Sequence, residues 1–240
     1  MGKKIILTYK PEIVPQISNW NAFEQKIKNP EIRKQHHTTG TKVEIAKYHL
    51  RKILSILPNQ QLTDVARITY DGKTNQHKFF ASNLEAQQYL ACLAEYDSFL
   101  FSLRGCIDSL LLEINSIYGL TLREHAITTK KIQEKMSSYY EKDPLTNYLT
   151  TTFQSDWFKY ITGLRNMAAH RINFPLYASI DLEAPTNYPL YLPDNPTAPK
   201  ISLNNNFKIL PKLNELLTET ENFLNISYNL FNQSKVSLKL

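Results

Sequence analysis

A chain of 240 residues can bury a substantial core, as one large domain or as one domain with an extension. Its six glycines stand against 14 tyrosines and 11 phenylalanines, and this composition favours packed helices over turn-rich β architecture. The net charge of +6 is compatible with a polyanionic partner without identifying one, and because no apolar run approaches about 18 residues, no membrane span is expected.

The N-terminal region is expected to hold two helices. The segment 18–28 favours a short helix, and Thr41 and Glu44 have the spacing of a capping box. This pair predicts a longer helix that runs to Leu57 and ends before Pro58.

A β-hairpin is expected next. The runs 65–70 and 77–80 are rich in β-branched and aromatic residues and are joined by a polar loop that contains Asp71-Gly72. We interpret residues 1–80 as a helix-rich extension with a small β element, packed on a bundle or supporting dimerisation.

The strongest structural signal is a predicted central helix over 83–118. Ser82 and Glu85 have capping-box spacing at its start, and Gly119 is expected to end it. Two series of apolar residues repeat every seven positions: Leu93, Leu100, Ile107 and Ile114, and Tyr96, Leu103, Leu110 and Ile117. Further apolar residues widen the stripe, so we expect this helix to be the centre of a bundle.

Three helices are expected after the central one. Thr121 and Glu124 predict a helix over 122–141, and Asp143 before Pro144 predicts the start of another. That second helix is expected to continue through Trp157 into the segment that carries the candidate site. The helix over 122–141 presents a basic face, made of Lys130, Lys131 and Lys135. A final helix is expected over 211–232.

Residues 175–200 hold six prolines and therefore cannot form a regular helix. We expect a stiff surface excursion or a lid. Tyr177, Tyr188 and Tyr191 in this excursion could stack bases, or could instead fasten the excursion to the bundle.

The cysteine positions and the N-terminal sequence predict the compartment. Cys92 and Cys106 lie 14 residues apart in one predicted helix, roughly 21 Å along its axis, so no disulfide can join them. The first ten residues have too few apolar side chains for a signal peptide. We therefore expect a cytoplasmic protein with buried, reduced cysteines.

The chemistry of the chain is concentrated at 164–170, where Arg165 and His170 stand five residues apart. Arginine is a permanent cation that forks onto phosphate oxygens, and histidine can move protons near neutral pH. Together they suffice to cleave RNA without a metal, because one group transfers the proton and the other stabilises charge on phosphorus. No other segment of the sequence offers a reaction.

The run DWFKYITGLRNMAAHR, at 156–171, resembles the signature of HEPN domains. Ribonucleases of this all-helical family carry an arginine, a polar residue that is often asparagine, three to five further residues and a histidine. Two protomers of that family pack their motif helices together and share one composite cleft. The resemblance implies that Arg165 and His170 are the functional pair and that Asn166 is the polar member.

Helix geometry sets a condition on this pair. Five residues advance by roughly 140° around a continuous helix, so Arg165 and His170 would not point the same way. They could converge if the helix broke near Gly163, or they could complement a second copy across a two-fold axis. The alternative is structural: Arg165 would cap or salt-bridge a helix end, and His170 would be a histidine favoured by the helix dipole.

Arg104 and Asp108 stand at i,i+4 in the central helix and are expected to pair with each other. HEPN domains often keep a polar residue on this helix. A contact between Asp108 and the motif, with Asp108 as a hydrogen-bond acceptor, is therefore the alternative.

Three histidines invite a metal interpretation: His36, His37 and His49. No carboxylate or cysteine stands at ligand spacing around them, so we interpret them as residues of a surface loop. We expect neither a metal nor a cofactor.

The sequence therefore predicts an all-α, HEPN-like bundle at 81–240 that acts as a metal-independent endoribonuclease. Its composite site would lie at a homodimer interface, in phage defence or a stress response. A regulatory protein or antitoxin is a further candidate partner, although HEPN toxins paired with nucleotidyltransferases usually have tyrosine where this chain has Ile172. The alternative is a non-catalytic HEPN-like module that dimerises and binds RNA or a protein. The candidate RNA-binding residues are Arg171, Lys130, Lys131 and Tyr177.

Overall fold

The computed structural model describes residue 17 and residues 19–56, 67–71, 76–80, 83–170, 177–178, 190–196 and 207–234. This part of the chain is predominantly helical, as expected. Its helices are α1 (Trp20–Glu24), α2 (Pro30–Ile56), α3 (Asn83–Ile117), α4 (Thr129–Tyr139), α5 (Pro144–Gln154), α6 (Asp156–His170) and α7 (Ile209–Gln233).

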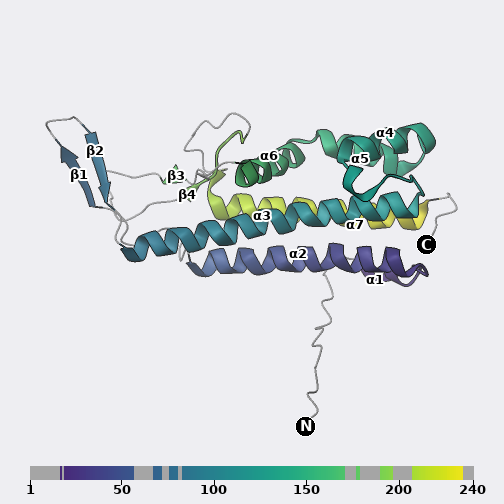
Figure 1. The fold of residues 1–240 in the computed structure, drawn as a ribbon, viewed down its shortest axis with the longest axis horizontal. Helices are drawn as coiled ribbons and strands as arrows, with labels where there is room; N and C mark the ends of the chain where they lie inside the picture. Colours follow the sequence, from purple (N-terminus) through teal and green to yellow (C-terminus); the bar gives the residue numbers. More distant parts are fainter. Residues whose placement is uncertain are drawn as a thin grey trace, which may run out of the picture.

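The two strand pairs lie toward the end of the body where α3 begins (Figure 1). Strands β1 (Arg67–Asp71) and β2 (Gln76–Phe80) pair antiparallel, with Arg67 opposite Phe80. Two shorter strands, β3 (Tyr177–Ala178) and β4 (Leu190–Tyr191), also pair antiparallel.

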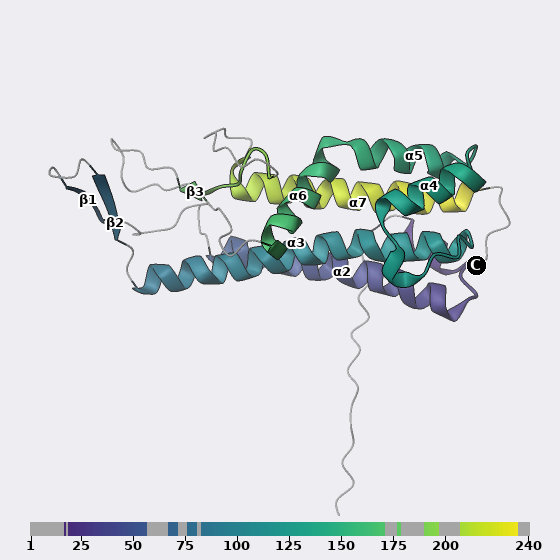
Figure 2. The same cartoon turned by 45° about the horizontal axis from the view of Figure 1, so that its top comes forward.

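The body is elongated and organised around α3. Helix α2 lies along one side of α3, and α7 lies along another (Figures 1 and 2). Helices α4, α5 and α6 form a further layer over α3 and α7. Helix α6 lies over the middle of α3, while α4 and α5 lie toward its C-terminal end (Figure 1).

The central helix has the predicted bounds and burial. Apart from Leu93, which is partly buried, the two heptad series are completely buried. The helix ends at Gly119, whose φ of 61° places it in the left-handed region that glycine tolerates. There Leu120 N–H donates to Asn115 O at 3.0 Å, a bond typical of a helix C-terminus.

Two hydrophobic clusters run along α3, and both include residues from before and after position 80. The first cluster joins the C-terminal half of α2 to α6 and to the start of α7. The second joins α1 and the start of α2 to α4, α5 and the end of α7. Because α2 contributes to both clusters, the N-terminal helices share the cores of the later ones.

Cys92 and Cys106 lie in these clusters as free, buried thiols, as predicted. Burial raises the pKa of each thiol to about 12, so both remain protonated at neutral pH. They act as packing residues.

Two predicted helix starts are wrong. Helix α2 begins at Pro30, where Asn29 Oδ1 accepts from the Glu31 N–H at 2.9 Å, so Thr41 lies inside the helix. Thr121 has a φ of 59°, which does not suit an N-cap; the helix starts at Thr129 instead, where Thr128 Oγ1 accepts from the Lys131 N–H.

The helix starts at Asp143 and near 211 are confirmed. Asp143 Oδ1 accepts from the Leu145 N–H at 2.9 Å, and Pro144 occupies the first helical position. Helix α7 covers the predicted 211–232, and one side of the helix is buried.

Candidate functional site

The predicted motif lies at the C-terminal end of α6. The sequence predicted a single helix from Pro144 into the motif, and this is wrong: α5 ends at Gln154 and α6 begins at Asp156. Between them Ser155 has extended backbone, with φ −66° and ψ 153°, and its hydroxyl donates to Thr152 O. Helix α6 is thereby free to take its own direction over α3.

Within α6 there is no break. Gly163 lies in the middle of the helix, which is continuous to His170. Positions 165 and 170 therefore lie roughly 140° apart around one helix axis. Of the two ways in which the pair could work together, the convergence through a break near Gly163 is not found.

Arg165 extends across the outer side of α3. Its Cζ lies 5.6 Å from the centroid of the Phe101 ring, and its Nη1 donates to Asn166 Oδ1 at 3.3 Å. Among the described residues, no carboxylate forms an ion pair with it. The guanidinium is held by a ring and an amide, and no acidic side chain of the described part of the chain pairs with it. Asn166, the polar member of the motif, thus contacts Arg165 directly.

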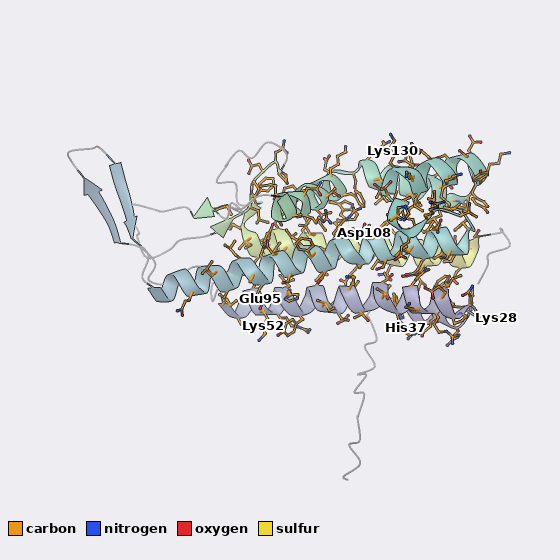
Figure 3. The ribbon with its side chains drawn as sticks, viewed as in Figure 1. Lys28, His37, Lys52, Glu95, Asp108 and Lys130 are labelled. Atoms are coloured by element: carbon orange, nitrogen blue, oxygen red, sulfur yellow. The ribbon has the colours of Figure 1, made fainter. Side chains whose placement is uncertain are left out.

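Asp108 forms the predicted pair within α3. Its Oδ1 lies 3.0 Å from Arg104 Nη2, and Arg104 also donates to Thr162 Oγ1 of α6 at 3.2 Å (Figure 3). Arg104 therefore balances the charge of Asp108. No contact between Asp108 and Arg165 occurs among the described residues.

Sequence reasoning missed Asp97. It lies on α3 one turn before Phe101, on the same face, in the direction in which α6 runs toward His170. Its Oδ1 is buried and has no hydrogen-bond partner, and burial raises the pKa of the carboxyl. A partly buried carboxylate that gains nothing from its surroundings is a candidate functional group. The only sequence signal is that position 97 falls outside both heptad series of α3.

The remaining candidate residues lie apart from Arg165 or outside the description. Lys130 is highly exposed on α4, at the other end of the body from the strands, and Lys131 is its neighbour (Figure 3). The structure does not bring these lysines to the motif. The side chains of His170 and Tyr177 and the whole of Arg171 lie outside the described residues. Tyr191 is buried, which fits a residue that fastens the excursion to the bundle.

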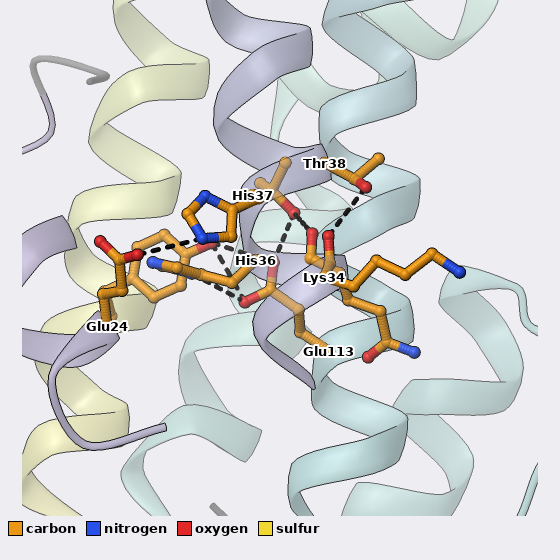
Figure 4. Close-up of polar contacts among 9 residues, drawn as sticks. Glu24, Lys34, His36, His37, Thr38 and Glu113 are labelled. Atoms are coloured by element: carbon orange, nitrogen blue, oxygen red, sulfur yellow. Dashed lines mark hydrogen bonds and ion pairs between the residues drawn. The ribbon is translucent and has the colours of Figure 1, made fainter. Parts of the chain in front are cut away.

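The interpretation of the histidines as surface-loop residues is wrong. All three lie on α2, and His36 is completely buried. Each histidine meets a glutamate from another element. His36 meets Glu113 and His37 meets Glu24 (Figure 4), and His49 meets Glu95. Ile32, Val43, Leu50 and Ile53 are apolar, recur with a helical period and are buried together with His36. The position of His36 in this apolar spacing is the sequence signal that could have placed it in the core.

Glu113 is the centre of a buried polar cluster, defined here as His36, Thr39, Glu113 and Tyr228. His36 Nδ1 lies 3.3 Å from Glu113 Oε2, the Thr39 hydroxyl donates to Oε1, and the Tyr228 hydroxyl donates to both oxygens at 3.1 and 3.2 Å. Burial and the Glu113 carboxylate raise the pKa of Tyr228 well above its ordinary value, so the phenol keeps its proton and donates it.

The cluster is closed by aromatic rings. The Trp20 ring stacks on His36 at 3.6 Å between centroids, and Tyr228 meets His36 edge-on at 5.0 Å. His36 Nε2 is buried and has no hydrogen-bond partner. The cluster thus joins α1, α2, α3 and α7 in the core, and its groups have no path to a substrate among the described contacts.

Two searches over the described residues were negative. They include no group of three or more histidine, cysteine or acidic side chains placed to hold a metal ion. None of their helices combines the length and apolar character needed to cross a membrane.

Comparison of the chain with known protein families, with curated proteins and with solved structures finds no match.

Proposed function

We propose that the protein is a metal-independent endoribonuclease of the HEPN type, with Arg165 and His170 as its catalytic residues. The observation that supports this most directly is the state of Arg165: its guanidinium is positioned by Phe101 and Asn166 and meets no acidic partner among the residues that the structure describes. A structural arginine would be expected to meet a carboxylate or a helix end, as Arg104 meets Asp108. The cation at Arg165 is instead available to an anion from outside.

The proposed reaction is transfer of the phosphate to the neighbouring ribose oxygen. His170 takes the proton of the 2′-OH, the 2′ oxygen forms a bond to phosphorus, and the bond from phosphorus to the 5′ oxygen breaks. The 5′ oxygen leaves with a proton supplied by water, and the other product carries a 2′,3′-cyclic phosphate. Arg165 stabilises the charge that develops on the phosphate oxygens, and Asn166 holds Arg165 in place.

The continuity of α6 favours a composite site. Positions 165 and 170 lie on different sides of one helix, so a single copy does not present both toward one phosphate by helix geometry alone. A two-fold arrangement of two α6 helices would bring Arg165 of one copy toward His170 of another. The proposal therefore includes a homodimer.

The test is cleavage of a labelled single-stranded RNA by purified protein in EDTA, beside His170→Ala and a DNA of the same sequence. We expect cleavage of RNA alone, a cyclic phosphate product, and loss of cleavage in His170→Ala. Light scattering at micromolar concentration should report a dimer. Cleavage that needs Mg²⁺ or Mn²⁺, or that acts on DNA, would show that the proposed chemistry is wrong. Binding of RNA without any cleavage would favour the non-catalytic module.

A further inference from the structure

The outer face of α3 carries an exposed aromatic ring beside the motif. Phe101 is 44% exposed, although it lies in the middle of the longest helix of the fold. Arg165 reaches it from α6, with its guanidinium 5.6 Å from the ring centroid. A phenylalanine ring has no polar group that can bond to water. When exposed, it offers a flat apolar face to a ligand.

A second cation approaches the same face from α2. The Lys42 side chain crosses α3 at Gly105, one turn after Phe101, so closely that a Cβ at Gly105 would lie 2.7 Å from Lys42 Cδ. A glycine inside a helix costs roughly 1 kcal/mol relative to alanine, and here it provides the room that the lysine occupies. No ion pair of Lys42 with an acidic side chain occurs among the described residues. Arg165 thus lies over the Phe101 ring, and Lys42 lies one turn further along the same face of α3, at Gly105.

The acidic residues of this face do not cancel these cations. Asp108 is matched by Arg104. Asp97, one turn before Phe101, sets one negative charge against the two positive charges of Arg165 and Lys42. The net character around the ring is cationic.

We propose that Phe101, Arg165 and Lys42 form a stacking platform for an unpaired base of single-stranded RNA; this rests on the proposed function, which supplies the ligand class. The base lies on the Phe101 ring and the Arg165 guanidinium, and the phosphates on either side meet Arg165 and Lys42. Aromatic side chains in a cationic groove bind single strands with little sequence preference, because every base has a flat face. The platform also places a phosphate next to Arg165, where the reaction requires it.

The molecule provides its own control. Tyr139 is 65% exposed, and Lys135 Nζ lies 5.0 Å from its ring centroid, on α4 rather than beside the motif. Tyr139 therefore has the local chemistry of an aromatic ring under a cation without the neighbouring Arg165.

The experiment measures binding of a fluorescent single-stranded RNA by anisotropy, in the His170→Ala protein so that no cleavage interferes. Phe101→Leu keeps an apolar side chain but removes the flat ring, and we expect it to weaken binding roughly 5- to 150-fold. Phe101→Trp should retain the affinity, Tyr139→Leu should not change it, and Lys42→Ala should weaken it and lower its salt dependence. An oligonucleotide of abasic ribose phosphates should bind the Phe101 protein as weakly as Phe101→Leu binds the normal RNA.

Two results would overturn the platform. One is an unchanged affinity in Phe101→Leu. The other is a change from dimer to monomer in Phe101→Leu by light scattering, which would assign the ring to the contact between copies. These outcomes are separate from the fate of the nuclease, which is measured by cleavage with His170 present. Weaker binding in Phe101→Leu supports the platform even if no protein cleaves RNA, and His170-dependent cleavage with unchanged binding supports the nuclease alone.

Discussion

Glu113 and Asp97, two carboxylates of α3, differ in how their surroundings satisfy them. Glu113 is completely buried and accepts hydrogen bonds from Thr39 and Tyr228 beside His36. These hydrogen bonds compensate for the loss of hydration of the carboxylate. Asp97 has a buried oxygen that accepts none. The C-terminal half of α3 thus uses its ionisable groups to hold helices together. Near the middle of α3, by contrast, Phe101 is exposed, Asp97 has an oxygen without a hydrogen-bond partner, and Arg165 of α6 forms no ion pair with the described residues.

The difference indicates where function should be sought. A satisfied buried network contributes to a unique packing of the helices, whereas unsatisfied charges lower stability and persist for other reasons. By this criterion the face of α3 that carries Asp97 and Phe101 is the functional end. The cluster around Glu113 is the structural end. Variants at the two ends should therefore separate activity from stability.

The largest expected effect is on cleavage. His170→Ala removes a general acid–base and should lower the rate about 10²- to 10⁴-fold, and Arg165→Lys should lower it about 10²- to 10³-fold because lysine lacks the guanidinium fork. Arg165→Lys should change RNA affinity far less than the cleavage rate. Rates under single-turnover conditions and melting temperatures would be measured together. If both variants cleave like the original protein, the motif is not catalytic, and if His170→Ala unfolds the chain, the histidine is structural.

The next effect is on stability, at the other end of α3. Glu113→Ala leaves the hydroxyl of Tyr228 and the ring of His36 buried without their acceptor, which should destabilise the fold by about 3–5 kcal/mol, while Thr39 keeps its bond to Gln35 O. Glu113→Gln keeps the volume and one carbonyl acceptor, so it should lose less. Urea unfolding measures both, and Glu134→Ala on the exposed side of α4 is the control. Equal unfolding midpoints for Glu113→Ala and the control would show that the cluster does not stabilise the core.

Sequence patterns predicted the parts of this fold that depend on local chemistry. Gly119 and Asp143 act within a few residues of themselves, so their positions as helix stop and N-cap could be read directly. The heptad series of α3 likewise predicted its burial. Thr41 and Thr121 failed because better starts, at Asn29 and Thr128, compete for the same helices.

The buried cluster could not be predicted in the same way. His36 and Glu113 lie 77 residues apart in the chain, and Tyr228 lies 115 residues from Glu113, so no spacing along the sequence reveals their contact. The same holds for Phe101 under Arg165, which depends on the direction α6 takes after Ser155. Sequence reasoning named Arg165 as a candidate, but only tertiary packing shows what it contacts.

A smaller effect is expected at Asp97. Burial raises the pKa of its carboxyl above the ordinary value of about 4, so the folded state is penalised wherever Asp97 is ionised. The penalty is present above the raised pKa, declines as the pH falls through it, and vanishes below the ordinary value of about 4. Asp97→Asn should therefore raise the melting temperature near pH 7, and this gain should disappear in acid. Thermal melts at several pH values measure it. If the gain in stability of Asp97→Asn does not depend on pH, it does not arise from the ionisation of Asp97.

The smallest expected effect is at Asp108. Its carboxylate is half exposed and pairs with Arg104 one turn away on the same helix, an arrangement that contributes only about 0.3–0.5 kcal/mol. Arg104 also keeps its bond to Thr162 and its position over the Phe158 ring, so it stays in place when Asp108 is removed. Asp108→Ala should therefore change neither the melting temperature by more than about 2 °C nor the cleavage rate by more than about twofold. The two measurements are made beside Asp97→Asn. A large loss of cleavage with intact stability in Asp108→Ala would mean that Asp108 does reach the motif when RNA binds, and the functional face of α3 would extend two turns beyond Phe101.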